Sequence, residues 1–264
     1  MPGLIIDGRV ELIPETVLNY KDHPELKLKA GEDMRARHTR WIRSIVLHNT
    51  KNISTFVAPG AGPSTKLGER IAKLWATDGR NAGAHLSVDW DGTICCHCDL
   101  LQDAAYHAGS LNEVSIGIEI YEDSKGMVYA DQLDVVVRLV QWLCQRFGIQ
   151  MQMPLAMDNS EIPRIKTGGS DCVGVFGHVH QWEAGKKHDP GFDVFKCLAA
   201  VGFKEFDFVG CDVTGAYWDV GYWIPIQAKL GLQCDGVPGP KTCDALQQLG
   251  FANGLYDFST PIKL

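Results

Sequence analysis

The sequence contains no long apolar run. Nowhere do about 18 apolar residues follow one another, so we expect no transmembrane helix. Basic residues are not in excess, since 25 Lys and Arg stand against 32 Asp and Glu, for a formal net charge of -7. This balance argues against a protein that binds nucleic acid through broad electrostatic attraction. The first residues lack a basic segment followed by an apolar one, so we expect no signal peptide and synthesis in the cytoplasm.

A disulfide framework and a common zinc-peptidase motif are also missing. The nine cysteines are an odd number without regular spacing, which favours reduced thiols. The sequence has no His-Glu-x-x-His motif. The run Cys95-Cys96-His97-Cys98 has the residue types of a metal site, but no second pair of ligands follows at a fixed spacing. Because neighbouring strand residues point to opposite faces, we expect this run to be structural.

What the sequence does contain is the pattern of a globular α/β protein. Its 264 residues are 45% hydrophobic and 22% charged, which is enough to form a sizeable core. Short apolar runs predict buried strands over 44–48, 114–121 and 173–176, and alternation predicts another over 84–90. Helical spacing predicts helices over 65–77 and 131–147, the second ended by Gly148. The predicted fold is therefore a mixed central β-sheet flanked by helices.

Changes in composition divide the chain into four predicted parts. Residues 1–40 begin with a hairpin signal at Asp7-Gly8 and continue as a polar, irregular arm. Residues 41–204 form the main α/β domain, and residues 205–221 form a linker. Residues 222–264 have the apolar spacing of a small helical module.

Polar residues at the ends of predicted strands indicate a metal site. His48 ends one buried strand, His178 follows another, and Asp189 comes eleven residues later. A zinc hydrolase needs three protein ligands and one open position, and strand ends can hold such ligands at a common edge. Glu119 on the central strand is the best candidate for the proton acceptor. Taken singly, each histidine could be a hydrogen-bonded structural residue, and Asp-Pro-Gly could be a turn.

These residues and their neighbours form five stretches across roughly residues 41 to 195. They are Ile45-Val46-Leu47-His48-Asn49-Thr50, Ala84 to Gly92, Ala105-Tyr106-His107-Ala108-Gly109, Ser115-Ile116-Gly117-Ile118-Glu119, and Gly177-His178 through Lys187-His188-Asp189-Pro190-Gly191. In this order the stretches resemble the type-2 N-acetylmuramoyl-L-alanine amidases, a family that includes phage amidases and animal peptidoglycan recognition proteins.

The resemblance implies a zinc enzyme that cuts the amide between the lactyl group of N-acetylmuramic acid and L-Ala of the peptidoglycan stem peptide. It implies that Zn²⁺ is bound by three residues, His48, His178 and Asp189. Glu119 would activate water, and Lys187 would stabilise the oxyanion. His107 and Asn49 would contact the substrate.

Some positions depart from the family pattern. Ala84 stands where some relatives have tyrosine, which indicates the Glu/Asp variety of the site. The loop before Asp189 is one residue longer than in the commonest form, so Lys186 competes with Lys187 for the catalytic position. Lys187 fits better, because it stands two residues before the aspartate. His180 and His188 also lie close enough in sequence to replace a ligand.

The C-terminal part has its own resemblance, to a short helical peptidoglycan-binding repeat. The matching residues lie within 226–246, and the alternative is a helical hairpin that packs on the main domain. We expect a lytic amidase, such as an endolysin or an injected effector, that acts on the cell wall or periplasm after release or delivery. The alternatives are a non-catalytic recognition protein on the same fold and a zinc peptidase that cuts within the stem peptide. The oligomeric state is left open.

Overall fold

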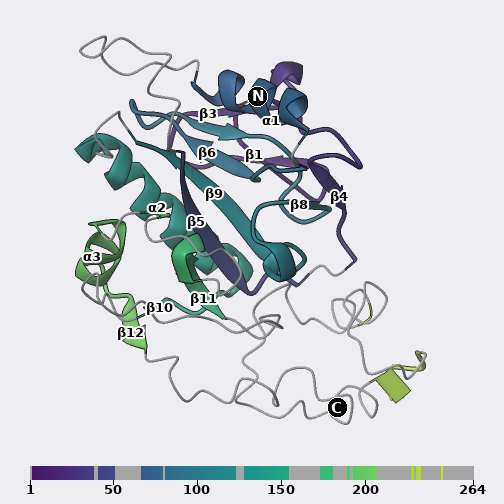
Figure 1. The fold of residues 1–264 in the computed structure, drawn as a ribbon. Coiled ribbons are helices and arrows are strands. Elements are labelled where there is room, and N and C mark those ends of the chain that lie inside the picture. The colour runs from purple at the N-terminus through teal and green to yellow at the C-terminus, as the bar shows by residue number, and fades with distance from the viewer. Residues whose placement is uncertain are drawn as a thin grey trace.

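The computed structural model is shown in Figure 1 and contains eighteen named helices and strands in the part of the chain that it describes. The described residues are 2–38, 41–50, 67–79, 81–122, 128–154, 173–180, 189–190, 193–206, 227–228, 230–232 and 245. The strands are β1 (Leu4–Ile6), β2 (Arg9–Glu11), β3 (Val17–Asn19), β4 (Met34–Ala36), β5 (Ser44–Thr50), β6 (Leu86–Val88), β7 (Ile94–Cys96), β8 (Asp103–Ala105), β9 (Ser115–Tyr121), β10 (Gln152–Pro154), β11 (Gly174–Gly177) and β12 (Lys204–Phe206). The helices are α1 (Leu67–Asp78), α2 (Ala130–Phe147), α3 (Asp193–Ala200) and the short 3₁₀ helices η1 (Pro24–Leu26), η3 (Gly109–Leu111) and η5 (His178–His180).

A six-stranded mixed sheet forms the centre of the protein. Its strand order is β11-β5-β9-β6-β7-β3, and the pairs from β11 to β6 are parallel. β7 runs antiparallel to β6 and parallel to β3. Every residue of β5 is buried, as expected for a central parallel strand that is covered on both faces. The predicted mixed sheet with flanking helices is confirmed.

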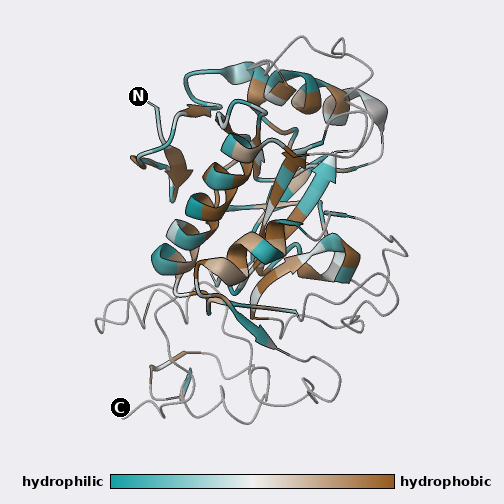
Figure 2. Ribbon diagram, turned by 90° about the vertical axis from the view of Figure 1, so that its left-hand side faces the viewer, coloured by the Kyte–Doolittle hydropathy of each residue, from teal (hydrophilic) through white to brown (hydrophobic). Residues whose placement is uncertain are grey.

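Helices α2 and α3 cover one face of this sheet. Their apolar residues share a core with Ile45, Leu47, Ile116 and Ile118 of the two central strands. Figure 2 shows apolar and polar residues alternating along α2, so that one side of the helix is apolar. The helix ends at Gly148, whose left-handed backbone (φ 64°) allows its N–H to bond to the carbonyl of Cys144. The sequence prediction of a helix ended by this glycine is confirmed.

The opposite face of the sheet carries α1 and a row of polar side chains. Strand side chains alternate, so His48, between the inward-packed Leu47 and Asn49, points to the face opposite α2. The parallel register aligns it with Glu119 of β9, which is aligned in turn with Ser87 of β6. α1 packs on this face through an apolar cluster whose members include Ile71, Trp75, Trp90 and Tyr121.

The N-terminal segment is packed against the main domain and does not form an extended arm. β1 and β2 form the predicted hairpin, with Asp7 and Gly8 at positive φ (49° and 74°). Beyond the hairpin, β3 forms the edge of the main sheet and β4 pairs with β8. The buried guanidinium of Arg37 donates hydrogen bonds to the carbonyl oxygens of Asp103, Asn112 and Glu113. The arm prediction missed these contacts, because sequence does not show which backbone carbonyls will collect around a buried arginine.

The last strand of the main domain ends close to the predicted domain boundary. β12 pairs with β10 and reaches Phe206, two residues past the predicted domain end at 204. Most of the predicted linker and of the C-terminal module lies outside the described residues.

Cys95, Cys96 and Cys98 are buried thiols, and His97 is hydrogen-bonded to Ser87 and to the carbonyl oxygen of Leu26. Among the described helices, none is both long and apolar enough to cross a membrane.

Asp89 gives the fold a testable pH dependence. Its buried carboxylate accepts hydrogen bonds from the backbone N–H groups of Leu67, at the start of α1, and of Trp90. Burial raises the pKa of Asp89 from 3.8 to about 7. The folded protein therefore binds this proton more tightly than the unfolded chain, and the resulting stabilisation is complete below about pH 4 and is lost as the pH rises through about 7.

We predict that Asp89→Asn removes this pH dependence. Between about pH 5 and about pH 8, the wild type should lose about 2 kcal/mol of stability relative to the variant. Thermal unfolding of both proteins across this range measures the effect. A difference in Tm that stays constant with pH would contradict the raised pKa.

Candidate metal centre

The sheet brings three sequence-predicted residues to one edge. His48 lies near the end of β5, and His178 follows Gly177, the last residue of the neighbouring strand β11. The two strands are parallel, so their carboxyl ends meet at the same edge of the sheet. Asp189 also lies at this edge, and residues 181–188, which precede it, lie outside the described residues. A separation of eleven residues in sequence thus becomes direct contact between His178 and Asp189.

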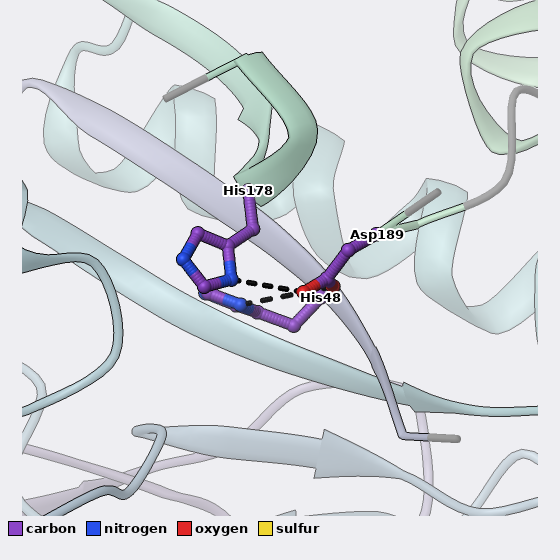
Figure 3. A group of neighbouring side chains, drawn as sticks. All are labelled: His48, His178 and Asp189. Atoms are coloured by element: carbon purple, nitrogen blue, oxygen red, sulfur yellow. Dashed lines mark hydrogen bonds and ion pairs between the residues drawn. The ribbon is translucent and has the colours of Figure 1, made fainter. Parts of the chain in front are cut away.

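Figure 3 shows the two imidazole rings and the carboxylate pointing toward one another. Nδ1 of His178 lies 2.9 Å from Oδ2 of Asp189, and Nδ1 of His48 lies 4.0 Å from Oδ1. The two rings meet edge to face, with centroids 4.6 Å apart. His48 and Asp189 are buried, while His178 is partly exposed. His178 is therefore the most exposed of the three side chains.

The backbone holds Asp189 in this place. The N–H of Asn49 donates a 2.8 Å hydrogen bond to its Oδ1, and the N–H of Val179 donates a 2.7 Å bond to its carbonyl oxygen. Pro190 lies against Gly177, where an added Cβ would come within 2.9 Å of the proline Cδ. Only glycine at 177 lets the Asp-Pro segment approach the strand this closely.

The three donor groups suit zinc. One potential ligand atom from each residue can be chosen so that all lie within 4.8 Å of one another. Ligands around a tetrahedral zinc ion lie about 3.3 Å apart, so small side-chain adjustments would suffice. Two imidazole nitrogens and one carboxylate oxygen form the kind of ligand set that leaves a fourth position open in catalytic sites. Among the described residues, no other group of His, Cys, Asp and Glu has this geometry.

Glu119 faces the same side of the sheet as His48, because the two residues are register partners in β9 and β5. Its side chain is half-buried, and Oγ1 of Thr50 donates a 2.7 Å hydrogen bond to its Oε2. Sequence reasoning missed Thr50. Its signal was its place two residues after His48 on one strand, which puts both side chains on one face.

His107 and Asn49, expected to contact substrate, both make contacts within the protein. Nδ1 of His107 lies 3.0 Å from Nε2 of His48. The side chain of Asn49 lies on the other face of β5 from His48, where it donates a hydrogen bond to the buried Glu122. Substrate contact by either residue stays a prediction.

Of the residues that the sequence offers as alternatives at the site, the structure describes His180. His180 is buried, accepts a 2.8 Å hydrogen bond from the N–H of Gly177 through its Nδ1, and packs edge to face on Phe195. These contacts give it a structural role next to the cluster. Lys186, Lys187 and His188 lie outside the described residues.

Comparison with known proteins identifies a family and similar solved structures. The family model described as N-acetylmuramoyl-L-alanine amidase matches residues 38–192, more than half of the 264 residues. A comparison with curated proteins gives no match.

Three similar solved structures are all distant in sequence. A mutant endolysin from Bacillus subtilis is 21% identical, with a TM-score of 0.46 over 70% of this chain and 97% of that one. The amidase LysC from Clostridium intestinale is 15% identical, with a TM-score of 0.45 over 70% and 96%. A Drosophila PGRP-LB mutant in complex with tracheal cytotoxin is 15% identical, with a TM-score of 0.47 over 72% and 96%.

The placement of two histidines on one short segment allows a matched test of the metal centre. We predict that His178→Ala weakens zinc binding at least about 100-fold, because it removes one of three ligands. His180→Ala should leave zinc affinity within a few-fold, since its ring faces Phe195. Competition with a chromogenic chelator measures both variants after circular dichroism has shown that they fold. Equal losses in the two variants would contradict the assignment of His178.

Proposed function

Because the chain belongs to the N-acetylmuramoyl-L-alanine amidase family, we propose that it is a zinc-dependent amidase. Its proposed reaction is hydrolysis of the amide between the lactyl group of N-acetylmuramic acid and L-Ala of the peptidoglycan stem peptide. The observation that carries the proposal is the convergence of His48, His178 and Asp189 on the face of the sheet to which Glu119 points. A histidine–carboxylate cluster and a separate, half-buried carboxylate are the parts that metal-assisted amide hydrolysis requires.

In the proposed mechanism, the cluster would hold the metal and Glu119 would move the proton. A zinc ion held by His48, His178 and Asp189 would lower the pKa of water toward about 7 and polarise the amide carbonyl. Glu119 accepts the proton of the attacking water and later gives it to the amine of the leaving L-Ala. The Thr50 hydroxyl holds one carboxylate oxygen of Glu119 and so orients the other.

Lys187 completes the proposal as the group that stabilises the negative charge of the tetrahedral intermediate. The support is its place two residues before Asp189, in the matched segment of the family model. A cation at this point would act where charge develops on the former carbonyl oxygen.

We infer a lytic role for the enzyme, as an endolysin or an injected effector that reaches the cell wall or periplasm after synthesis in the cytoplasm. The support is the resemblance of residues 226–246 to a peptidoglycan-binding repeat. Such a module would raise the local concentration of an insoluble substrate around the catalytic domain. With a net charge of -7, broad attraction to an anionic wall would not replace it.

The direct test uses purified protein and isolated sacculi. We predict the release of free stem peptides that begin at L-Ala, detected by mass spectrometry. A chelator should abolish the release, because the proposed reaction needs the metal. Added zinc should restore it, because the metal binds reversibly to its three side-chain ligands. Binding to sacculi without released peptide, with zinc present at one ion per chain, would instead indicate a non-catalytic recognition protein. Release of peptides cut within the stem would indicate a peptidase.

Glu119 can be tested separately from the metal. We predict that Glu119→Gln lowers the turnover number by about 10²- to 10⁴-fold, because the amide keeps the shape but cannot accept the proton. Zinc content should stay at the wild-type level, since Glu119 is not one of the three clustered donors. The matched control is Glu25→Gln, which changes an exposed carboxylate that pairs with His23 in the N-terminal segment. Wild-type turnover of Glu119→Gln would remove this residue from the mechanism.

A further inference from the structure

The cluster continues into the protein through a chain of hydrogen-bonding groups. Nε2 of His48 lies 3.0 Å from Nδ1 of His107. On the other side of that ring, Nε2 of His107 lies 3.2 Å from Oγ of Ser115. Oγ of Ser115 in turn lies 2.6 Å from the carbonyl oxygen of Leu111. The chain therefore links His48 to a backbone carbonyl through one histidine and one serine.

The carbonyl at the end of the chain sets the direction of every hydrogen bond. A carbonyl oxygen can only accept, and two oxygens 2.6 Å apart require a proton between them, so the Ser115 hydroxyl donates to Leu111. The serine oxygen then accepts from Nε2–H of His107. A neutral imidazole carries one proton, so Nδ1 of His107 must accept the hydrogen bond from Nε2–H of His48. His48 is thereby left with its lone pair on Nδ1.

This nitrogen of His48 faces the cluster. Nδ1 is the atom that lies 4.0 Å from Oδ1 of Asp189, and a metal ligand must present a lone pair there. In the other tautomer, Nδ1 would carry a proton toward the Asp189 carboxylate. That tautomer would be attracted to the carboxylate and would have to be reversed before His48 could bind a metal.

Packing holds the ring of His107 in the position that this chain needs. The ring lies on the backbone of Gly117, where an added Cβ would come within 2.6 Å of the His107 Cγ. His48 and His85 contact the ring edge to face, with centroid distances of 5.2 and 5.4 Å. The hydrogen-bonding direction is thus built into a ring that has little room to turn.

We propose that His107 is a positioning residue that keeps the proton of His48 on Nε2 and its lone pair on Nδ1, directed at the metal centre. The proposal rests on the proposed zinc function, and it assigns His107 a role in metal affinity in place of the substrate contact expected from the sequence. Partners of this kind on ligand histidines change metal affinity by about 10- to 100-fold in other proteins.

The tautomer of His48 can be read directly in the metal-free protein. Long-range ¹H–¹⁵N spectra distinguish Nδ1–H from Nε2–H imidazoles, and they should be recorded at about pH 8, above the ordinary histidine pKa of about 6.5. We predict that wild-type His48 is the Nε2–H tautomer. In His107→Phe, which keeps a ring on Gly117 but has no ring nitrogen, Nδ1–H should become populated.

Zinc affinity gives the second readout, by competition with a chromogenic chelator. His107→Phe should bind zinc about 10- to 100-fold more weakly than the wild type. His107→Gln should recover part of this loss, because its amide can accept from His48 and donate to Ser115. Ser115→Ala should cause a smaller loss than His107→Phe, because the ring remains but its tautomer is no longer fixed.

A second buried histidine–serine pair in the same domain provides a matched control. Nε2 of His97 lies 2.8 Å from Oγ of Ser87, and its Nδ1 lies 2.9 Å from the carbonyl of Leu26. Ser87→Ala and His97→Phe remove similar buried hydrogen bonds from the same domain without touching the chain that ends at His48. Zinc affinity should stay at the wild-type level in both, once their folding has been shown by circular dichroism.

An unchanged His48 tautomer and unchanged zinc affinity in His107→Phe would overturn the proposal. So would a rise in KM for sacculi fragments with zinc affinity unaltered, because that result would show substrate contact. Neither the spectra nor the chelator competition depends on turnover. Zinc binding without cleavage of sacculi would therefore refute the proposed enzyme activity and leave the role of His107 to be decided by these two measurements.

Discussion

The site depends on the parallel register of β11, β5 and β9. Parallel strands end at the same edge of a sheet, so His48 and His178 meet although 130 residues separate them in sequence. The same register sets His48 beside Glu119, on the face away from α2. A slip of one residue between β5 and β9 would turn either His48 or Glu119 into the apolar core. Burial of Ile45, Leu47, Ile116 and Ile118 against α2 resists such a slip. The hydrophobic core thereby fixes the chemistry on the other face.

Two glycines in these strands allow other parts of the site to approach the sheet closely. Gly117 in β9 lets the ring of His107 lie directly on the strand, and Gly177 in β11 does the same for Pro190. Both glycines stand where a side chain would push a part of the site outward, in one case the partner of His48 and in the other the segment with Asp189. Their cost in strand stability is offset by groups that pack in the space they leave. The motifs Ile-Gly-Ile-Glu and Gly-His thus combine a steric requirement with a chemical one.

The sequence was sufficient for the central strands, for α1 and α2 and for the three clustered residues, because their signals are local, but it did not predict α3 or the short strands β3, β4, β8, β10 and β12. The apolar run before His48, the apolar face of α2 and the left-handed Gly148 each follow from neighbouring residues. Contacts between distant segments could not be predicted in this way. The cage of carbonyl oxygens around Arg37 and the chain from His107 to Leu111 depend on how β8, η3 and β9 meet in space. The side-chain direction of Asn49 was predictable in principle, since it must point away from the face of His48.

The position of β11 adds a link between metal binding and stability. β11 contributes four residues to the main sheet, where, among the described strands, it pairs with β5 and lies at the edge. Asp189 is bonded to Val179, which follows His178, and also to Asn49 of β5, the strand that carries His48. Separation of β11 from β5 would therefore move His178 away from His48 and break the contacts of Asp189 with one of the two sides. A metal shared by all three would resist this separation, and its binding free energy would then be added to the stability of the edge strand. The proposed catalytic ion would in this way also fasten the edge strand β11 to the centre of the sheet.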